Sequence, residues 1–192
     1  GLAFADTIGP DCKTCSGSTY TLQYAYMGGI GGDSFFDIFF TIDTTGYNGG
    51  GSLLDDVAFK VSSSDPSSVS LISAPNGEAN WNIFAGGINA GGCDGSGSGW
   101  VCAEAASLAF AAAVPDGIYT WHFNLTLPTG DIFLAPGASS IKARYTDSQG
   151  NKVGDLVSED ITVQPVPEPA TLALFGSGLL GLAGIFRRRL VK

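Results

Sequence analysis

The chain has 192 residues, enough for one ordinary domain with a hydrophobic core. It has 18 acidic and 9 basic residues, and four of the basic residues follow the last apolar run, so residues 6–165 contain 17 acidic and 5 basic residues. This acidic body argues against binding of nucleic acid, whose phosphates need a basic face, and against a body that lies on an anionic membrane.

The composition favours an exported β protein. The chain contains 28 glycines, and 14% of its residues are charged. Helix-forming residues are scarce in the body, whereas Thr, Val, Ile, Phe and Tyr are common. At the start, Ala3-Phe4-Ala5 matches the small-residue pattern of a signal-peptidase site. We therefore expect residues 1–5 to be a signal-peptide remnant and residues 6–164 to be the exported domain.

Apolar and polar residues alternate along most of the body, which is the pattern of half-buried strands. The alternation predicts strands near residues 19–27, 35–43, 57–61, 69–73, 81–83, 108–114, 118–127, 139–147 and 156–164. We expect Tyr20, Leu22, Tyr24 and Tyr26 to share one face of the first strand. The expected core contains Phe36, Ile38, Phe40, Phe59, Trp121, Phe123 and Leu125.

Short strands separated by glycine-rich turns, without a convincing helix, predict an all-β fold. We expect a single antiparallel β-sandwich. The pattern leaves open whether its topology is jelly-roll or immunoglobulin-like.

The sequence offers little catalytic equipment. His122 is the only histidine, and Thr120 and Asn124 place it on the polar face of its strand, where we expect a solvated side chain rather than a catalytic base. One histidine excludes a multi-histidine zinc site, and the chain has no nucleophile-elbow, phosphate-loop or dinucleotide motif. We therefore expect no enzyme activity, no cofactor and no metal centre.

Two binding alternatives remain open. The acidic loop residues that could bind Ca²⁺ are Asp43, Asn48, Asp55 and Asp56 around one loop, and Asp33 and Asp37 around another. Their spacing does not match an EF-hand, so solvated acids are the simpler interpretation. For sugar stacking, Trp100 in the Gly/Ser-rich loop is the best exposed candidate, because Trp81 and Trp121 lie in alternating strands and belong to the expected core.

The four cysteines allow three pairings, and disulfides are the usual state of cysteines in an exported chain. We favour the local pairs Cys12–Cys15 and Cys93–Cys102, because the second closes the glycine-rich loop. The spacing between Cys93 and Cys102 does not suit a zinc site that also uses Cys12 and Cys15.

The C-terminus differs from the rest of the chain. Residues 170–186 are seventeen uncharged residues, about 25 Å as a helix and at the short end for a transmembrane span. Arg187, Arg188 and Arg189 follow at once and should stay cytoplasmic, which places the body outside. We therefore expect a short C-terminal transmembrane helix.

The order and spacing of Pro167-Glu168-Pro169, the apolar segment and the arginines resemble a PEP-CTERM sorting signal, which we assign to residues 165–192. The resemblance implies recognition by an exosortase, an integral-membrane cysteine peptidase of Gram-negative, exopolysaccharide-producing bacteria. It also implies an inner-membrane anchor before processing, and afterwards a place in the cell envelope or in the extracellular matrix of a biofilm.

The sequence leads to two alternative hypotheses of function. The first is a non-enzymatic surface or matrix protein associated with exopolysaccharide. The second is a carbohydrate-binding or cation-dependent binding module at the cell surface, with Trp100 or the loop acids as contacts.

Overall fold

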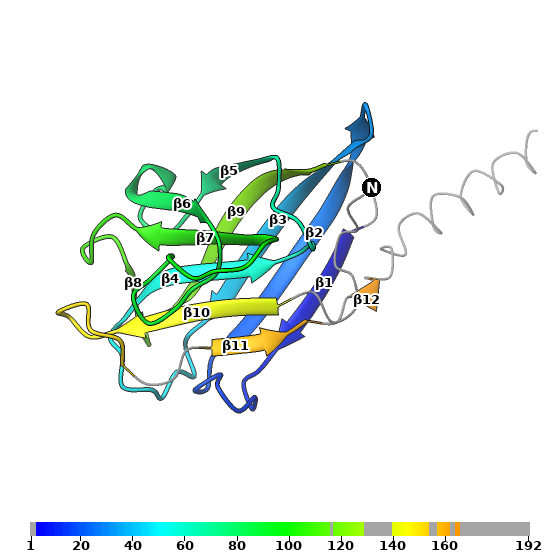
Figure 1. The fold of residues 1–192 in the computed structure, drawn as a ribbon. Coiled ribbons are helices and arrows are strands. Elements are labelled where there is room, and N and C mark those ends of the chain that lie inside the picture. Colours follow the sequence, from blue (N-terminus) through cyan, green and yellow to red (C-terminus); the bar gives the residue numbers. More distant parts are fainter. Residues whose placement is uncertain (1–2, 116, 129–139, 154–156, 162–163, 166–192) are drawn as a thin grey trace, which may run out of the picture.

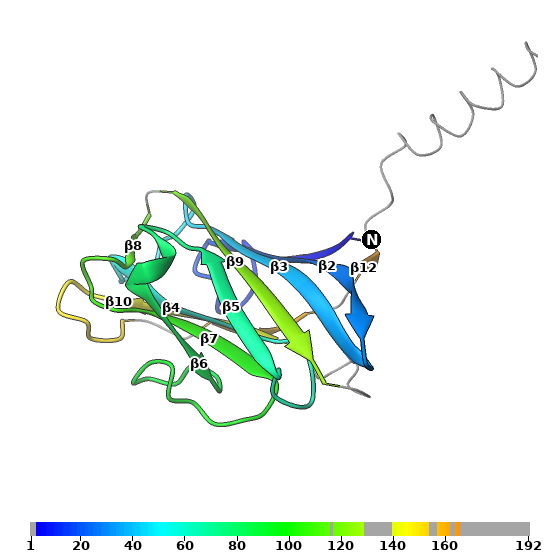
Figure 2. The same cartoon turned by 90° about the horizontal axis from the view of Figure 1, so that it is seen from above.

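The computed structural model describes residues 3–115, 117–128, 140–153, 157–161 and 164–165. Within these residues the fold is all-β, with two antiparallel sheets that face each other (Figures 1 and 2). The one helical element is the short 3-10 helix η1, Glu78–Asn80. This confirms the predicted all-β class and its two antiparallel layers.

Sheet A forms one layer. Its strands, in spatial order, are β12 (Gln164–Pro165), β1 (Ala3–Ile8), β2 (Thr19–Ile30), β3 (Asp33–Asp43), β9 (Ile118–Leu127) and β5 (Ser68–Ser73). Sheet B forms the other layer. Its strands are β11 (Val157–Asp160), β10 (Ser140–Thr146), β4 (Leu53–Lys60), β7 (Trp100–Ala105) and β6 (Trp81–Ala85), and β8 (Ala112–Ala113) also pairs with β4.

The core lies between the sheets and is rich in aromatic rings. Phe59 of β4 meets Phe123 of β9 edge to face, with ring centroids 5.0 Å apart. Trp81 and Trp121 meet in the same way at 5.2 Å. All seven residues of the expected core are buried. The alternation in the sequence thus identified the inner faces of both sheets.

Tyr26 keeps its register opposite Phe36 and their rings lie 5.5 Å apart, so it shares the face of the preceding alternate residues as expected, although it is 45% exposed. Two other predicted features of the strands are wrong. Of residues 108–114, Ala112 and Ala113 alone form a strand, since the carbonyl groups of Phe110 and Ala111 accept hydrogen bonds from the Asn76 side chain.

The predicted last strand, 156–164, is divided between the layers. Val157–Asp160 pairs with β10 in sheet B, whereas Gln164–Pro165 pairs with β1 in sheet A. Ile161, between the two, is buried as expected. Val163, expected to face inward, lies outside the described residues.

Strand β1 joins the two ends of the body. Phe4 pairs with Tyr24 of β2 on one side and with Pro165 of β12 on the other, and Ala5 pairs with Gln23 and Gln164. Residues expected to be a signal-peptide remnant therefore form part of sheet A. The cleavage before Asp6 stays a prediction.

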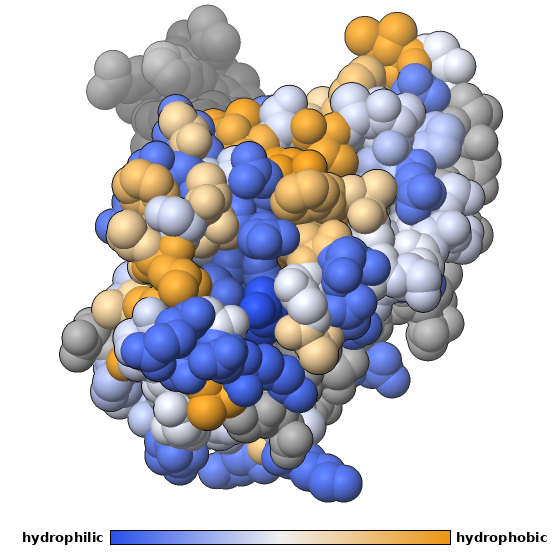
Figure 3. All heavy atoms as spheres, turned by 60° about the vertical axis from the view of Figure 1, so that its left-hand side comes forward, coloured by the Kyte–Doolittle hydropathy of each residue, from blue (hydrophilic) through white to orange (hydrophobic). Residues whose placement is uncertain are grey.

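The surface has both hydrophilic and hydrophobic areas. Figure 3 shows a hydrophilic band between hydrophobic areas on one side of the molecule. The large hydrophobic residues exposed in the described part of the chain are Tyr26, Met27, Ile30, Ile72, Phe84 and Ile118.

Candidate functional site

A groove of about 420 Å³ lies on sheet A. It is lined by residues from β2, β3, β5 and β9, namely Met27, Phe35, Phe36, Asp37, Ser68, Ser70, His122, Asn124, Leu125 and Thr126. Neighbouring strands bring these residues together, since Asp37 pairs with Asn124, and Asn124 pairs with Ser70. Because alternate residues of a strand point to opposite faces, the polar members of this set share the face away from the core.

His122 lies in the groove, paired and stacked rather than free in solvent. Its Nε2 contacts Asp37 Oδ1, and its ring stacks on Phe39 with centroids 4.1 Å apart and planes 15° apart. The predicted polar face of β9 is confirmed, but the predicted solvated side chain is wrong, because only 21% of the His122 side chain is exposed. The signal that could have revealed this pair is the alternation of β3, which places Asp37 and Phe39 on its outer face.

Hydroxyl groups extend this face across the sheet. The hydroxyl of Thr41 bonds that of Thr120 at 2.9 Å. At the edge of the groove, the Ser68 hydroxyl donates to the Thr126 hydroxyl at 3.0 Å. Hydroxyl and amide groups can both donate and accept, and aromatic faces offer apolar contact. This combination suits a ligand that is itself rich in hydroxyl groups.

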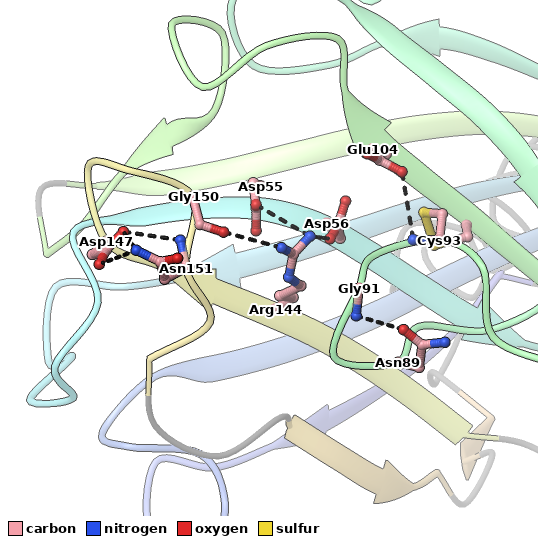
Figure 4. Close-up of polar contacts among 11 residues, drawn as sticks. Asp55, Asp56, Asn89, Gly91, Cys93, Glu104, Arg144, Asp147, Gly150 and Asn151 are labelled. Carbon is pink, nitrogen blue, oxygen red and sulfur yellow. Dashed lines mark hydrogen bonds and ion pairs between the residues drawn. A yellow bond between two sulfur atoms is a disulfide. The ribbon is translucent and has the colours of Figure 1, made fainter.

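A second cluster of charged residues lies on sheet B, beneath the loop before β7 (Figure 4). Arg144 of β10 lies across from Asp56 of β4, with Nη1 2.6 Å from Asp56 Oδ2 and 3.4 Å from Asp55 Oδ2. Arg144 Nη2 also donates to the Gly150 carbonyl at 3.3 Å. The prediction that Asp55 and Asp56 are solvated loop acids is wrong, because both belong to β4 and are buried.

The cluster carries more negative than positive charge. Burial, and next the charge of Asp55, raise the pKa of Asp56 to about 7, although Arg144 opposes this shift. Burial likewise raises the pKa of Asp55. One carboxylate oxygen of each, Oδ1, has no hydrogen-bond partner. The role of Arg144 could not be predicted from any motif, and the one available signal is that Arg144 is one of five basic residues in an acidic body.

The cluster is a poor cation site as it stands. Ligand atoms of Asp56, Glu104 and Cys93 lie within 4.8 Å of one another. However, the Cys93 sulfur is in a disulfide, and the Arg144 guanidinium already faces Asp56. Ca²⁺ needs six to eight oxygen ligands. The group of three supplies the carboxylates of Asp56 and Glu104 alone, and the positively charged Arg144 lies beside them.

The other acidic candidates do not join this cluster. Asp37 is in the groove of sheet A. Asp43 accepts hydrogen bonds from the backbone and hydroxyl of Thr45, and these bonds hold its pKa below the usual value. Asn48 donates its backbone N–H to the Ser16 carbonyl, and Asp33 pairs with Ile30 across the β2–β3 hairpin. Of the proposed calcium ligands, only the neighbouring residues Asp55 and Asp56 therefore lie together in the part of the chain that the structure describes.

Trp100, the best exposed tryptophan by sequence, is 8% exposed, so this prediction is wrong. It packs with Ala58, Ile88, Cys93 and Cys102 in a small second core under the loop. Glycines of the loop approach its ring, and Lys142 Nζ lies 4.6 Å from its centroid. Trp81 and Trp121 are buried between the sheets as expected.

Both predicted disulfides are present, Cys12–Cys15 and Cys93–Cys102. Cys102 is in β7, and Cys93 is in the loop that covers the outer face of sheet B. The backbone N–H of Cys93 donates to Glu104 at 3.4 Å (Figure 4). The second disulfide therefore holds this loop over Trp100.

Comparison with protein families gives one match. Residues 165–189 match the PEP-CTERM protein-sorting motif. The match contains all six residues assigned to the signal, which are Pro167, Glu168, Pro169, Arg187, Arg188 and Arg189. Neither the curated proteins nor the solved structures gave a match.

The body is thus an all-β sandwich, and the motif marks it as an exported protein directed to an exosortase and anchored in a membrane before processing. The chain is a PEP-CTERM sorting domain-containing protein. Among the described residues, no helix has the length and apolar character needed to cross a bilayer. The predicted transmembrane segment, 170–186, lies outside those residues.

Proposed function

We propose that the processed sandwich is a non-enzymatic surface or matrix protein that associates with exopolysaccharide in the cell envelope or biofilm of a Gram-negative bacterium. The groove on sheet A is its proposed contact surface. The observation that carries this proposal is the joining of aromatic rings, hydroxyl groups and an amide in that groove.

The chemistry of the groove favours an uncharged glycan. Its volume is within the range of about 300–1,000 Å³ that is usual for small-ligand sites. Phe35 offers an apolar face, while Asn124, Ser70 and Thr126 supply groups that donate and accept hydrogen bonds. Because the body is strongly acidic, a polyanionic polysaccharide would be repelled. Neutral polysaccharides are therefore the proposed ligands.

The arrangement also supports the absence of glycosidase activity. Hydrolysis of a glycoside normally requires two carboxyl groups on opposite sides of the scissile bond. Asp37 is the one carboxylate among the described residues that line the groove, and it is paired with His122. The contact between Asp37 and His122, together with the stacking of His122 on Phe39, thus shapes the groove.

The test is affinity electrophoresis of the full chain, kept in a non-ionic detergent, through gels that contain neutral or anionic polysaccharides. We expect a neutral polysaccharide to retard the chain, and Phe35→Ala and Asn124→Ala to reduce the retardation at least about tenfold, as the loss of one good contact predicts. Phe84→Ala is the matched control, because Phe84 is an exposed phenylalanine on sheet B. Equal retardation of all variants, or of none, would contradict the proposal.

A further inference from the structure

The tip of the β2–β3 hairpin is an exposed apolar feature. Met27 is 66% exposed and Ile30 is 78% exposed, and Tyr26 precedes them. Three of the six exposed large hydrophobic residues of the described chain thus lie within five consecutive positions. Figure 1 shows this hairpin projecting at the top of the molecule, above the N-terminal end of the chain.

The chain leaves the body toward this hairpin. Strands β12 and β2 are both antiparallel to β1, so β12 runs in the same direction as β2, toward the hairpin tip. Phe4 pairs with both Pro165 and Tyr24, which places the last described residue level with Tyr24. This alignment holds in the chain that retains residues 3–5, because Phe4 and Ala5 are the pairing partners of β12.

The linker to the apolar tail is short compared with the hairpin. Residues 166–169 separate Pro165 from Ala170, where the apolar segment begins. Even fully extended, the chain from Pro165 to Ala170 spans at most about 18 Å. Ile30 lies six residues beyond Tyr24 on β2, but the bulge after Tyr26 reduces this to five steps along the partner strand, or about 17 Å further toward the tip. When the tail enters the bilayer, the hairpin tip therefore reaches the same level.

The charge along the hairpin suits this position. Residues 19–32, which form β2 and the turn, contain no charged side chain, and Asp33, the pairing partner of Ile30, is the first charge on the returning strand of this otherwise acidic body. An acidic surface is repelled by anionic lipid headgroups, so an uncharged segment can approach most closely. Apolar side chains such as those of Met27 and Ile30 are stabilised when they enter the boundary between headgroups and acyl chains.

We propose that, in the chain that retains both residues 3–5 and the C-terminal tail, the tip of the β2–β3 hairpin inserts into the outer surface of the membrane that holds the tail, with Met27 and Ile30 as the inserted side chains. The hairpin and the tail then form two points of contact. Together they fix the orientation of the sandwich and hold the segment at Pro167-Glu168-Pro169 beside the bilayer. The inference goes beyond glycan binding and concerns the chain before processing, although Met27 also lines the groove on sheet A.

The test uses the full chain, beginning at residue 1, reconstituted into vesicles of neutral phosphatidylcholine with brominated acyl chains. Ile30→Trp introduces a fluorescent probe at the tip. Ile118→Trp is the matched control, because Ile118 is 64% exposed and pairs with Asp43 at the opposite end of sheet A. We expect added emission from Ile30→Trp to shift to the blue and to be quenched at least about twofold, whereas the added emission of Ile118→Trp stays unquenched.

Controls separate the outcomes. Near-ultraviolet circular dichroism of both variants must match that of the parent chain, and Met27→Trp serves as a second probe if Ile30→Trp does not fold. Equal quenching at both positions, or none at either, overturns the proposal. A blue shift without quenching overturns it as well, because it would indicate a second copy or another protein on the tip. A full chain that does not float with vesicles also overturns it, since no tail would then hold the tip at a bilayer.

Discussion

Arg144 and Asp56 face each other across β10 and β4, with a separation of 2.6 Å between Nη1 and Oδ2, and the Asp56 side chain is fully buried. Their pairing coincides with a register shift after Arg144, where Asp55 becomes an additional residue on β4. The shift lets two consecutive aspartates approach one guanidinium. The ion pair thus connects β10 and β4 at the point where their hydrogen-bond ladder is interrupted by the bulge.

Removal of Arg144 should destabilise the fold strongly. Arg144→Met leaves two buried carboxylates without a cation, and loss of one partner of a buried ion pair costs about 3–5 kcal/mol. Lys60→Met, at the end of the same β4 strand, should cost less than about 1 kcal/mol. Urea unfolding followed by tryptophan fluorescence measures both. Similar losses in the two variants would show that the buried pair has no special role.

The pH dependence of stability should reveal the raised pKa of Asp56. Since this pKa is about 7 in the folded chain and 3.8 in the unfolded reference, the folded state binds the proton more tightly. The contribution of Asp56 is therefore fully present below pH 3.8 and is lost as pH rises through about 7. We expect the free energy of unfolding to fall between pH 5 and pH 8, and to fall less in Asp56→Asn. A steeper fall in that variant would contradict the assignment.

Loss of the Cys93–Cys102 disulfide should release the loop over Trp100. The double variant Cys93→Ser/Cys102→Ser should lower the free energy of unfolding by about 2–3 kcal/mol and shift tryptophan emission to the red. The control, Cys12→Ser/Cys15→Ser, opens a disulfide in the segment between β1 and β2 and should leave the emission unchanged. Peptide mapping without reductant checks the pairing. Recovery of Cys12 linked to Cys93 or Cys102 would refute it.

Two glycines with positive φ should differ in their tolerance of alanine. Gly99 has a φ of +79°, and a Cβ there would overlap the Ser62 carbonyl oxygen, whereas Gly31 has a φ of +66° and faces open space. Gly31→Ala should cost about 1–2 kcal/mol from conformation alone. Gly99→Ala should cost about 1–3 kcal/mol more, because the backbone must move. Thermal unfolding compares them, and equal costs would contradict the close approach.

Local alternation was enough to predict the inner faces of the sheets. Phe36, Ile38 and Phe40 are buried because a regular strand repeats every two residues, and this period is visible in the sequence. The local disulfides could be predicted for a similar reason, since each pair is close in the chain. Long-range contacts could not be predicted in this way.

The errors come from such long-range contacts. Trp100 is buried because the loop between β6 and β7 folds back over it, which no periodicity encodes. Asp55 and Asp56 are buried because Arg144, 88 residues beyond Asp56, lies beside them. The groove also depends on strand order, since β3 and β9 are neighbours only after the sheet has formed. Phe39 was therefore missed as a partner of His122.

Strand β1 makes the two ends of the body depend on each other. Both residues that pair with β12, Phe4 and Ala5, lie before the predicted cleavage at Asp6, whereas Asp6, Thr7 and Ile8 pair with β2 alone. A cut before Asp6 would remove both partners of β12 and leave the rest of β1 in the sheet. Phe4 and Ala5 thus hold Gln164 and Pro165 against sheet A. Removal of residues 1–5 would release these two residues and so lengthen the connection between the sandwich and the sorting motif.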